Sequence, residues 1–453
     1  RSEALFRTYR GRLRPLSHYT LGWLPRLTRV TARVPGLAAV ANAIMSVAPL
    51  RSLAFRIIGL DPRRGMPALQ SGTVTAWARR RNLLAGSVPA GDAASSFTAT
   101  PGTAAPAAAS SDTAARAAAS SAAATSAAAS SDTAARAAAS SDTAARAAAS
   151  SSAKSPSAAT SAAATDARER GGTPASCDST RERGGTPASS NSAREREAAT
   201  ASSMSVSPIL SGPRDPGGRP YALVWADSFS QTLDGTGARA VVDVLEANGF
   251  APIVAPDACC GLTWITTGQL TGAKKHLSSL LGVLAPFAAS GIPIVGVEPS
   301  CTAVLRDDLM DLLPEDPRSA LVSGATHTLA EVLSAVPESS RNLPSLEGVE
   351  IVAQPHCHHY SVMGWDTDQA LLESLGARVT RLEGCCGLAG NFGMEAGHYD
   401  LSVAVASHSL LPSLSAQPDA VYLADGFSCR TQAAQLAGRG GVHLATLLAG
   451  RSA

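Results

Sequence analysis

The chain has 453 residues, with 38 lysines and arginines against 36 aspartates and glutamates, so its net charge is close to zero. This balance argues against a nucleic-acid-binding surface, which needs a marked excess of basic residues. No apolar run is long enough to cross a membrane, because the best candidate, residues 36–60, is interrupted by Pro49, Arg51 and Arg56. A cytoplasmic protein without a transmembrane span is therefore expected, with peripheral attachment at the inner membrane face as the alternative.

Residues 1–60 carry apolar side chains at helical intervals, and Pro25 and Pro35 stand where a helix would start or kink. Residues 1–14 are strongly basic, a composition that suits an anionic membrane surface. Proline and glycine interrupt any long amphipathic face, however. This favours a helical segment, residues 1–85, that docks on a neighbouring domain.

The middle of the chain is of low complexity. Residues 98–203 contain no Val, Ile, Leu, Met, Phe, Tyr or Trp, and they repeat SSDTAARAAA and RERGGTPAS. Such a tract buries too little apolar surface to offset its chain entropy. A disordered linker is predicted over residues 86–215, in which Cys177 is a free thiol.

Strand and helix signals alternate from residue 219 onward, and the same order occurs twice. This pattern predicts an α/β fold in which two repeated parallel-sheet units, residues 216–345 and 346–453, form one body. The strands are expected at residues 221–226, 251–255, 292–297, 349–353, 378–382 and 420–424. The longer helices are expected at residues 237–248, 268–289, 302–313, 318–336 and 398–411.

Cysteines recur where the predicted strands end. Because the carboxyl ends of parallel strands meet at one edge, these thiols are expected to converge there. Adjacent cysteines face one site only where the backbone turns sharply, and Gly384 and Gly387 permit such a turn. The first unit contributes Cys259, Cys260 and Cys301, and the second contributes Cys357, Cys385, Cys386 and Cys429.

Four thiolates suffice for an iron–sulfur cluster or a tetrahedral metal, so the main metal centre is predicted in the second unit. The three thiols of the first unit would line the same cleft or hold a weaker site, completed by an acid such as Asp227. Other polar residues near the thiols would orient ligands or line the pocket, although solvated loop residues are commoner. These are His356, His358, His359, Asp227, Glu298 and Asp425.

The motifs EPSC, HCHH, GCCGLAGNFG and ADGFSCRTQ, together with RPLSHYTLGWLPR, carry a family resemblance. They resemble the cysteine-rich "CCG" domain of heterodisulfide reductase, glycolate oxidase and anaerobic glycerol-3-phosphate dehydrogenase iron–sulfur subunits. More narrowly, they resemble the C-terminal part of actinobacterial FAD-linked D-lactate (D-2-hydroxyacid) dehydrogenases. The resemblance covers residues 5–70 and 219–450.

The resemblance implies an iron–sulfur cluster, of the 4Fe–4S type, that transfers electrons. It places FAD on an absent domain or on a partner flavin dehydrogenase subunit, with a quinone or a cytochrome as electron acceptor. In the family each unit has a leading cysteine, then CCG, then a terminal CxxC. Here the terminal pairs are reduced to Cys301 and Cys429, and Asp227 and Ser228 stand near the place of the first unit's leading cysteine.

Two other functions remain open: a thiol–disulfide redox module and a structural zinc-binding domain. The chain shows no glycine-rich flavin-binding segment and no ferredoxin-type cysteine run. By itself it is therefore not expected to oxidise D-lactate or glycolate.

Overall fold

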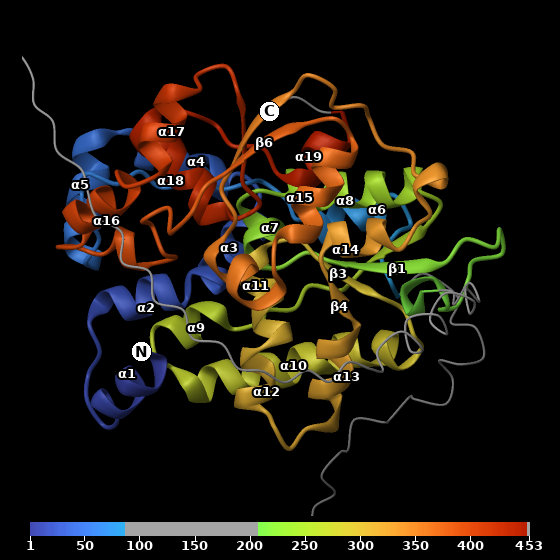
Figure 1. Cartoon of the computed structure of the whole chain (residues 1–453). Coiled ribbons are helices and arrows are strands. Elements are labelled where there is room, and N and C mark those ends of the chain that lie inside the picture. Colours follow the sequence, from blue (N-terminus) through green and yellow to red (C-terminus); the bar gives the residue numbers. More distant parts are fainter. Residues whose placement is uncertain (87–206, 451–453) are drawn as a thin grey trace, which may run out of the picture. The chain divides into compact units, whose positions relative to one another are not determined.

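The computed structural model describes residues 1–86 and 207–450, shown as coloured ribbons in Figure 1. Most of the predicted linker, including Cys177, lies outside the described residues. The last part of that range, from residue 207, is described: it forms a short 3₁₀ helix, Pro208–Leu210, and Arg214 pairs with Pro220. The architecture is α/β with parallel sheets, as predicted.

The first sheet has four parallel strands in the order β2-β1-β3-β4. Its central strand, Tyr221–Trp225, is an unbroken apolar run, which is typical of a strand buried on both faces. The strands are β1 (Tyr221–Trp225), β2 (Ala251–Val254), β3 (Ile294–Gly296) and β4 (Thr326–His327). The helices are α7 (Ser228–Thr232), α8 (Thr236–Ala247), α9 (Leu262–Thr266), α10 (Leu270–Ala289), α11 (Pro299–Arg306), α12 (Asp308–Leu312), α13 (Pro317–Ala325) and α14 (Leu329–Ser334).

The second sheet has three parallel strands in the order β6-β5-β7. In both sheets the first strand of the unit lies in the centre, the second on one side and the third on the other. The two units therefore share one topology. The strands are β5 (Glu350–Ala353), β6 (Arg378–Arg381) and β7 (Val421–Leu423). The helices are α15 (Asp366–Ser374), α16 (Tyr399–Ala406), α17 (Leu410–Ala416), α18 (Phe427–Ala437) and α19 (Leu444–Leu448), with a π-helix, η4, at His359–Met363.

Side-chain alternation along the central strands divides the core into three clusters. Ala222 and Val224 pack in a cluster that Ile351 and Ala353 also enter, so this cluster is shared by the two sheets. The opposite face of the first sheet packs on α9–α11 and α13, and the opposite face of the second packs on α16–α18. The sites at the strand ends are thus held on a well-packed scaffold.

Three helix predictions were wrong in detail. The helix expected over residues 398–411 ends at Ala406, and α17 begins only at Leu410. The helix expected over residues 318–336 is interrupted by β4, because Thr326 and His327 pair with the edge of the first sheet. The helix expected over residues 302–313 breaks at Asp307, between α11 and α12. Tertiary pairing overrides local helical periodicity at such points.

The N-terminal residues form helices that dock on the α/β body, as expected. Phe55 and Leu60 are fully buried against the second unit, and Arg14 donates hydrogen bonds to the carbonyls of Thr267 (2.8 Å) and Gly268 (2.7 Å). In Figure 1 the blue helices lie beside α9 at one end and α16 at the other. They are α1 (Ser2–Thr8), α2 (Leu16–Gly22), α3 (Leu24–Arg33), α4 (Leu37–Ser46), α5 (Ala48–Ile58) and α6 (Val74–Arg80).

The outer face of these helices is apolar and exposed. Among the described residues, no single helix has the length and hydropathy of a membrane span, although α4 and α5, bent by 100°, would pass if taken together. Most of the exposed large apolar side chains of the described residues lie on α2–α5 or in the loops between them. They include Leu27, Val30, Val34, Val40, Ile44, Leu50, Leu53 and Ile57.

Candidate metal centre

The four cysteines of the second unit converge at one edge of its sheet. Cys357 follows β5, Cys385 and Cys386 follow β6, and Cys429 lies in the first turn of α18, after β7. Their thiols form a chain of contacts in the order Cys357, Cys385, Cys386, Cys429. The thiols of Cys357 and Cys386 donate to the Cys385 sulfur and hold its pKa well below the usual range. The predicted convergence is therefore present in the structure.

The CCG turn has the sharp backbone geometry that adjacent cysteines require. The Gly387 N–H donates to the Cys385 sulfur at 3.3 Å, and Gly387 has a φ of 90°. A Cβ atom at Gly387 would lie 2.2 Å from the carbonyl oxygen of Ser402, so no other residue fits without moving the loop. Glycine is thus required both by the backbone angle and by the close approach of α16.

The second unit's thiols lie beside open space. Cys386 and Cys429 are buried, whereas Cys357 is exposed and Cys385 is half-buried. Cys357 and Cys385 line a cavity of about 680 Å³ together with Arg381. A second cavity of about 210 Å³, mostly apolar, also reaches Cys357. This arrangement leaves room for a group larger than a single ion.

A buried arginine from the N-terminal segment holds the CCG loop. Arg64 is completely buried and donates to the Gly393 carbonyl (2.7 Å), the Gln432 side-chain carbonyl (2.8 Å) and the Ser402 hydroxyl (2.6 Å). The Ser402 hydroxyl in turn donates to the Gly387 carbonyl at 2.6 Å. Arg64 forms no ion pair with a carboxylate among the described residues, although the charge of Asp61 lies near enough to interact with its guanidinium. No motif in the sequence marks this role.

The first unit's cysteines form a similar chain, Cys259–Cys260–Cys301, but lie in the apolar core. They are 7%, 2% and 1% exposed. The pKa of each thiol is raised: hydrogen bonding to a neighbouring thiol leads at Cys259 and burial leads at Cys301. The Gly261 N–H donates to the Cys259 sulfur at 3.4 Å, as in the second unit.

Asp227 and Ser228 take the place of a leading cysteine. Ser228 contacts the Cys259 thiol, as Cys357 contacts Cys385 in the second unit. Asp227 caps α7 instead: its carboxylate accepts from the N–H groups of Phe229 (2.8 Å) and Ser230 (3.2 Å). Its other oxygen accepts from the Ser230 hydroxyl at 2.7 Å.

An arginine also lies beside the first unit's cysteines, but it is paired with an acid. Arg29 forms a bidentate ion pair with Asp257, with its shortest contact at 2.7 Å, and donates to the Ser228 hydroxyl. Its guanidinium also contacts Cys259. The positive charge next to this set of thiols is therefore neutralised within the protein.

Glu298 connects the two units. It is buried at the end of β3, and its oxygens accept from the Ser300 hydroxyl (2.9 Å) and from the N–H of Phe427 at the start of α18 (2.8 Å). Burial and the nearby Asp227 raise its pKa to about 7. Glu298 thus joins the first turns of α11 and α18, which carry Cys301 and Cys429.

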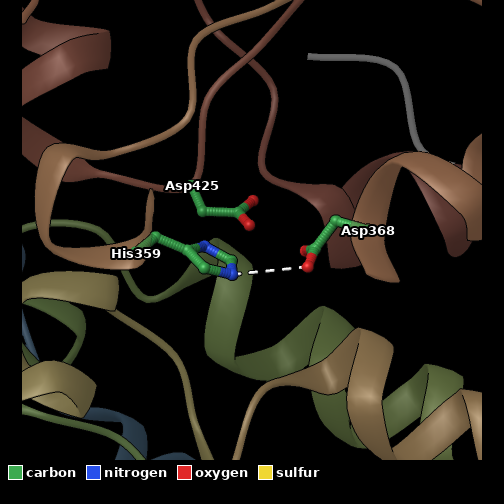
Figure 2. A group of neighbouring side chains, drawn as sticks. All are labelled: His359, Asp368 and Asp425. Atoms are coloured by element: carbon green, nitrogen blue, oxygen red, sulfur yellow. Dashed lines mark ion pairs between the residues drawn. The ribbon is translucent and has the colours of Figure 1, made fainter. Parts of the chain in front are cut away.

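The three histidines around Cys357 point in different directions. His356 is buried against Ser428, with its Nε2 3.3 Å from the Ser428 hydroxyl, and burial lowers its pKa to about 3, which keeps it neutral. His358 is half-buried and stacks edge-on against His356. His359 instead faces Asp368, on α15, and Asp425, as Figure 2 shows.

Asp368 carries no sequence signal, because it lies on the polar, acidic first turn of α15 like its exposed neighbour Asp366. His359, Asp368 and Asp425 are the one set of three or more histidine, cysteine or acidic ligand atoms within 4.8 Å of one another in the described chain. Each set of cysteine sulfurs is more spread out than this.

No protein-family model matches the chain. It is 28% identical over 224 residues to D-2-hydroxyglutarate dehydrogenase of Escherichia coli, a match that covers 49% of this chain and 22% of that enzyme. The corresponding enzyme of Pseudomonas putida is 26% identical over 47% of this chain and 20% of its own length. One subunit of the anaerobic glycerol-3-phosphate dehydrogenase of Escherichia coli is 27% identical over 173 residues, which are 36% of this chain and 42% of that subunit.

The matched region thus spans about a fifth of the D-2-hydroxyglutarate dehydrogenases and about two fifths of the glycerol-3-phosphate dehydrogenase subunit. Both kinds of relative are dehydrogenase chains. The chain is therefore homologous to oxidoreductases, through a region that is only a part of each relative.

Proposed function

We propose that this chain is the iron–sulfur, electron-transferring part of an FAD-linked D-2-hydroxyacid dehydrogenase. The observation that carries the proposal is the convergence of Cys357, Cys385, Cys386 and Cys429 beside a cavity. Four soft thiolates suit iron–sulfur clusters or zinc. When bound, such a cluster supplies one-electron chemistry.

The spacing of the thiols favours a cluster over a single zinc ion. Thiolates around one tetrahedral zinc lie roughly 3.8 Å apart, given a Zn–S distance of about 2.3 Å. No three cysteine sulfurs in the described residues lie within 4.8 Å of one another. A cluster distributes its thiolate ligands over several iron atoms, so a wider arrangement suits it. The adjacent cavity gives the added volume.

The electrostatics of the CCG loop support an anionic group at the same place. Arg64 is a buried cation with no ion-pair partner in the described part of the chain; the charge of Asp61 reaches it, and it also lies near enough to Cys386 to attract a thiolate there. The Gly387 N–H adds a hydrogen bond to sulfur. Such hydrogen bonds and nearby charges set cluster potentials in iron–sulfur proteins.

The partner of this chain would be a flavin dehydrogenase domain or subunit, which holds FAD and oxidises a D-2-hydroxy acid such as D-lactate, glycolate or D-2-hydroxyglutarate. The chain would relay the electrons to an acceptor. Of a quinone and a cytochrome, the mostly apolar cavity of about 210 Å³ beside His356 and Cys357 favours the flat ring of a quinone.

A quinone acceptor would place the chain at the inner membrane face, and the N-terminal helices support this location. Residues 1–60 contain ten arginines and one acidic residue, Glu3, and their outer face is apolar. An apolar face with basic residues binds anionic bilayers. The chain should sediment with anionic vesicles and not with zwitterionic ones; no binding to either would refute this location.

Metal analysis of anaerobically purified chain tests the main proposal. We expect brown protein with iron and acid-labile sulfide, and an electron paramagnetic resonance signal on reduction. Zinc in place of iron would establish the structural zinc site. Colourless, metal-free protein with a disulfide among the four cysteines would establish the redox module. Stoichiometric flavin in the isolated chain, with dye reduction by a hydroxy acid, would overturn the relay role.

A further inference from the structure

We propose that His359, Asp368 and Asp425 form a second metal site, which binds one divalent transition-metal cation through nitrogen and oxygen ligands. Nothing in this inference requires the cluster at the cysteines, because the three side chains lie in a different cavity. Figure 2 shows the imidazole and the two carboxylates directed toward a common point.

Three separate elements bring these ligands together. His359 begins the π-helix η4 after β5, Asp368 lies in the first turn of α15, and Asp425 follows β7. The ligand atoms lie within 4.8 Å of one another, and His359 Nε2 is 3.3 Å from Asp368 Oδ2. Ligands around one tetrahedral zinc ion are roughly 3.3–3.6 Å apart, since their bonds are about 2.0–2.2 Å long. Small side-chain rotations would complete the geometry.

The space between the ligands has the volume of one ion or one water molecule. A cavity of about 20 Å³ is lined by all three side chains. A cavity of roughly 10–15 Å³ already accommodates a water molecule. Gly296, Val297 and Thr328 of the first unit form another wall of this cavity. The cation would therefore lie where the two units meet.

The buried polar groups around the cavity have few partners besides one another, and a cation would supply the missing one. His359 is 3% exposed, and neither of its ring nitrogens makes a hydrogen bond in the described structure. Asp368 is 2% exposed and pairs with His359 alone among the described residues. Buried polar and charged groups normally have hydrogen-bond or metal partners.

Asp425 is held in position and retains a free oxygen. Its Oδ1 accepts from the Leu444 N–H at 2.6 Å, while Oδ2 accepts no hydrogen bond from the described residues. His443 lies nearby, but both of its ring nitrogens already make hydrogen bonds. Its Nε2 donates to the Val297 carbonyl at 3.1 Å, so its Nδ1 is the acceptor for the Ala445 N–H. His443 also lines the cavity, but because both of its ring nitrogens are occupied, three side chains and not four are free to bind a cation.

The ligand set indicates the kind of cation. Two carboxylates neutralise a divalent ion, which matters in a buried site. Imidazole selects transition metals over magnesium and calcium, while carboxylates suit manganese better than thiolates do. Zinc, manganese and ferrous iron share this preference for mixed nitrogen and oxygen ligands. The cation would tie β5, α15 and the loop after β7 together, next to the residues that carry Cys357.

Manganese discriminates between this site and the cysteines, because it is a hard ion that thiolates bind weakly. We would measure total zinc and manganese in the purified chain, then titrate it with Mn²⁺ and follow free Mn²⁺ by electron paramagnetic resonance. One equivalent should bind and raise the melting temperature. Asp368→Asn and Asp425→Asn should each weaken binding on the order of 100-fold or more.

Two controls separate a metal site from other outcomes. Asp366→Asn removes an exposed carboxylate from the same helix, and Cys386→Ser removes a thiol; both should bind Mn²⁺ like the parent chain. Unchanged circular dichroism shows that the Asp368→Asn and Asp425→Asn variants are folded. The proposal fails if the folded parent contains no such metal and binds no Mn²⁺. It also fails if Cys386→Ser abolishes binding while both aspartate variants retain it.

Discussion

The two cysteine units share a topology but differ in what surrounds their thiols. In each, a backbone N–H of the glycine after the cysteine pair donates to sulfur. In each, an arginine from the N-terminal segment also lies beside the pair. The first unit's thiols are buried in the core, and Arg29 is neutralised by Asp257. In the second unit Cys386 and Cys429 are buried as deeply, but Cys357 and Cys385 border cavities, and Arg64 forms no ion pair with an acid among the described residues.

This difference shows how one fold can use its cysteines either for packing or for binding a metal. A strand-end loop with cysteines can be filled by apolar packing, in which case the thiols act as small buried side chains. The same loop can be left open and supplied with positive charge, in which case the thiols remain available as ligands. We expect the second unit to carry the metal and the first to provide packing.

The largest expected effect is on metal content. Cys386→Ser should lower bound iron roughly tenfold or more, because a cluster loses one of four thiolates. Cys301→Ser should retain most of the iron, since Cys301 belongs to the first unit, which has only three cysteines and buries all of them. Iron and sulfide assays on the two variants provide the comparison. The opposite ranking would assign the chemistry to the first unit.

The two glycines after the cysteine pairs should differ in their tolerance of alanine. Gly387→Ala should lower the free energy of unfolding by about 3–5 kcal/mol, because its Cβ would overlap the Ser402 carbonyl oxygen and its φ is positive. Gly261→Ala has its nearest neighbour, in Ala273, at 3.2 Å and should cost about 1–2 kcal/mol. Denaturant unfolding measures both. Equal losses would mean that the two loops are equally tight.

Replacing Arg64, the arginine beside the second unit's cysteines, should also cost more stability and more iron than replacing Arg29 beside those of the first. Arg64→Met leaves the Gly393 carbonyl and the Gln432 side-chain carbonyl without a donor, and should cost about 2–4 kcal/mol and release iron. Arg29 is partly exposed, so Arg29→Met should lower the free energy of unfolding by only about 1–2 kcal/mol and should retain the iron. A cluster potential that shifts in Arg64→Lys but not in Arg29→Lys would add support. If the Arg64 and Arg29 variants lost the same stability and iron, the two arginines would not differ in their effect on the metal centre.

The smallest predicted effect is a pH dependence confined to the first unit. Burial acts to raise the pKa of Glu331, but hydrogen bonds from His327 and the Thr328 N–H and the charge of Arg306 lower it to about 2. A lowered pKa contributes stability above the unfolded value of about 4.5, and this stability is lost as the pH falls from there through about 2.

Glu331→Gln should therefore cost about 1–2 kcal/mol near pH 6, after allowance for partial exposure, and little at pH 2. Urea unfolding at both pH values checks this. The variant should keep its iron, because Glu331 lies on α14 of the first unit. A loss of iron would show that the two units are more closely coupled than their separate sheets suggest.

Local sequence alone was enough for the α/β class and the place of the cysteines. Apolar strand runs such as residues 221–225 and amphipathic helices such as residues 236–247 are encoded by neighbouring residues. Parallel strands then bring their carboxyl ends to one edge, so Cys357, Cys385 and Cys429 had to approach one another. The glycine turn at Gly387 also follows from local geometry.

Tertiary structure alone decided which side chains join those loops. Arg64 reaches Gly393 across 329 residues of sequence, and His359 meets Asp425 only because β5 and β7 are neighbours. Asp227, a possible ligand by its position, is a helix cap in the structure. The spacing of apolar residues does not encode contacts across such long stretches of sequence. It also does not encode which way one histidine among three points. Both depend on how whole elements pack, which no local pattern specifies.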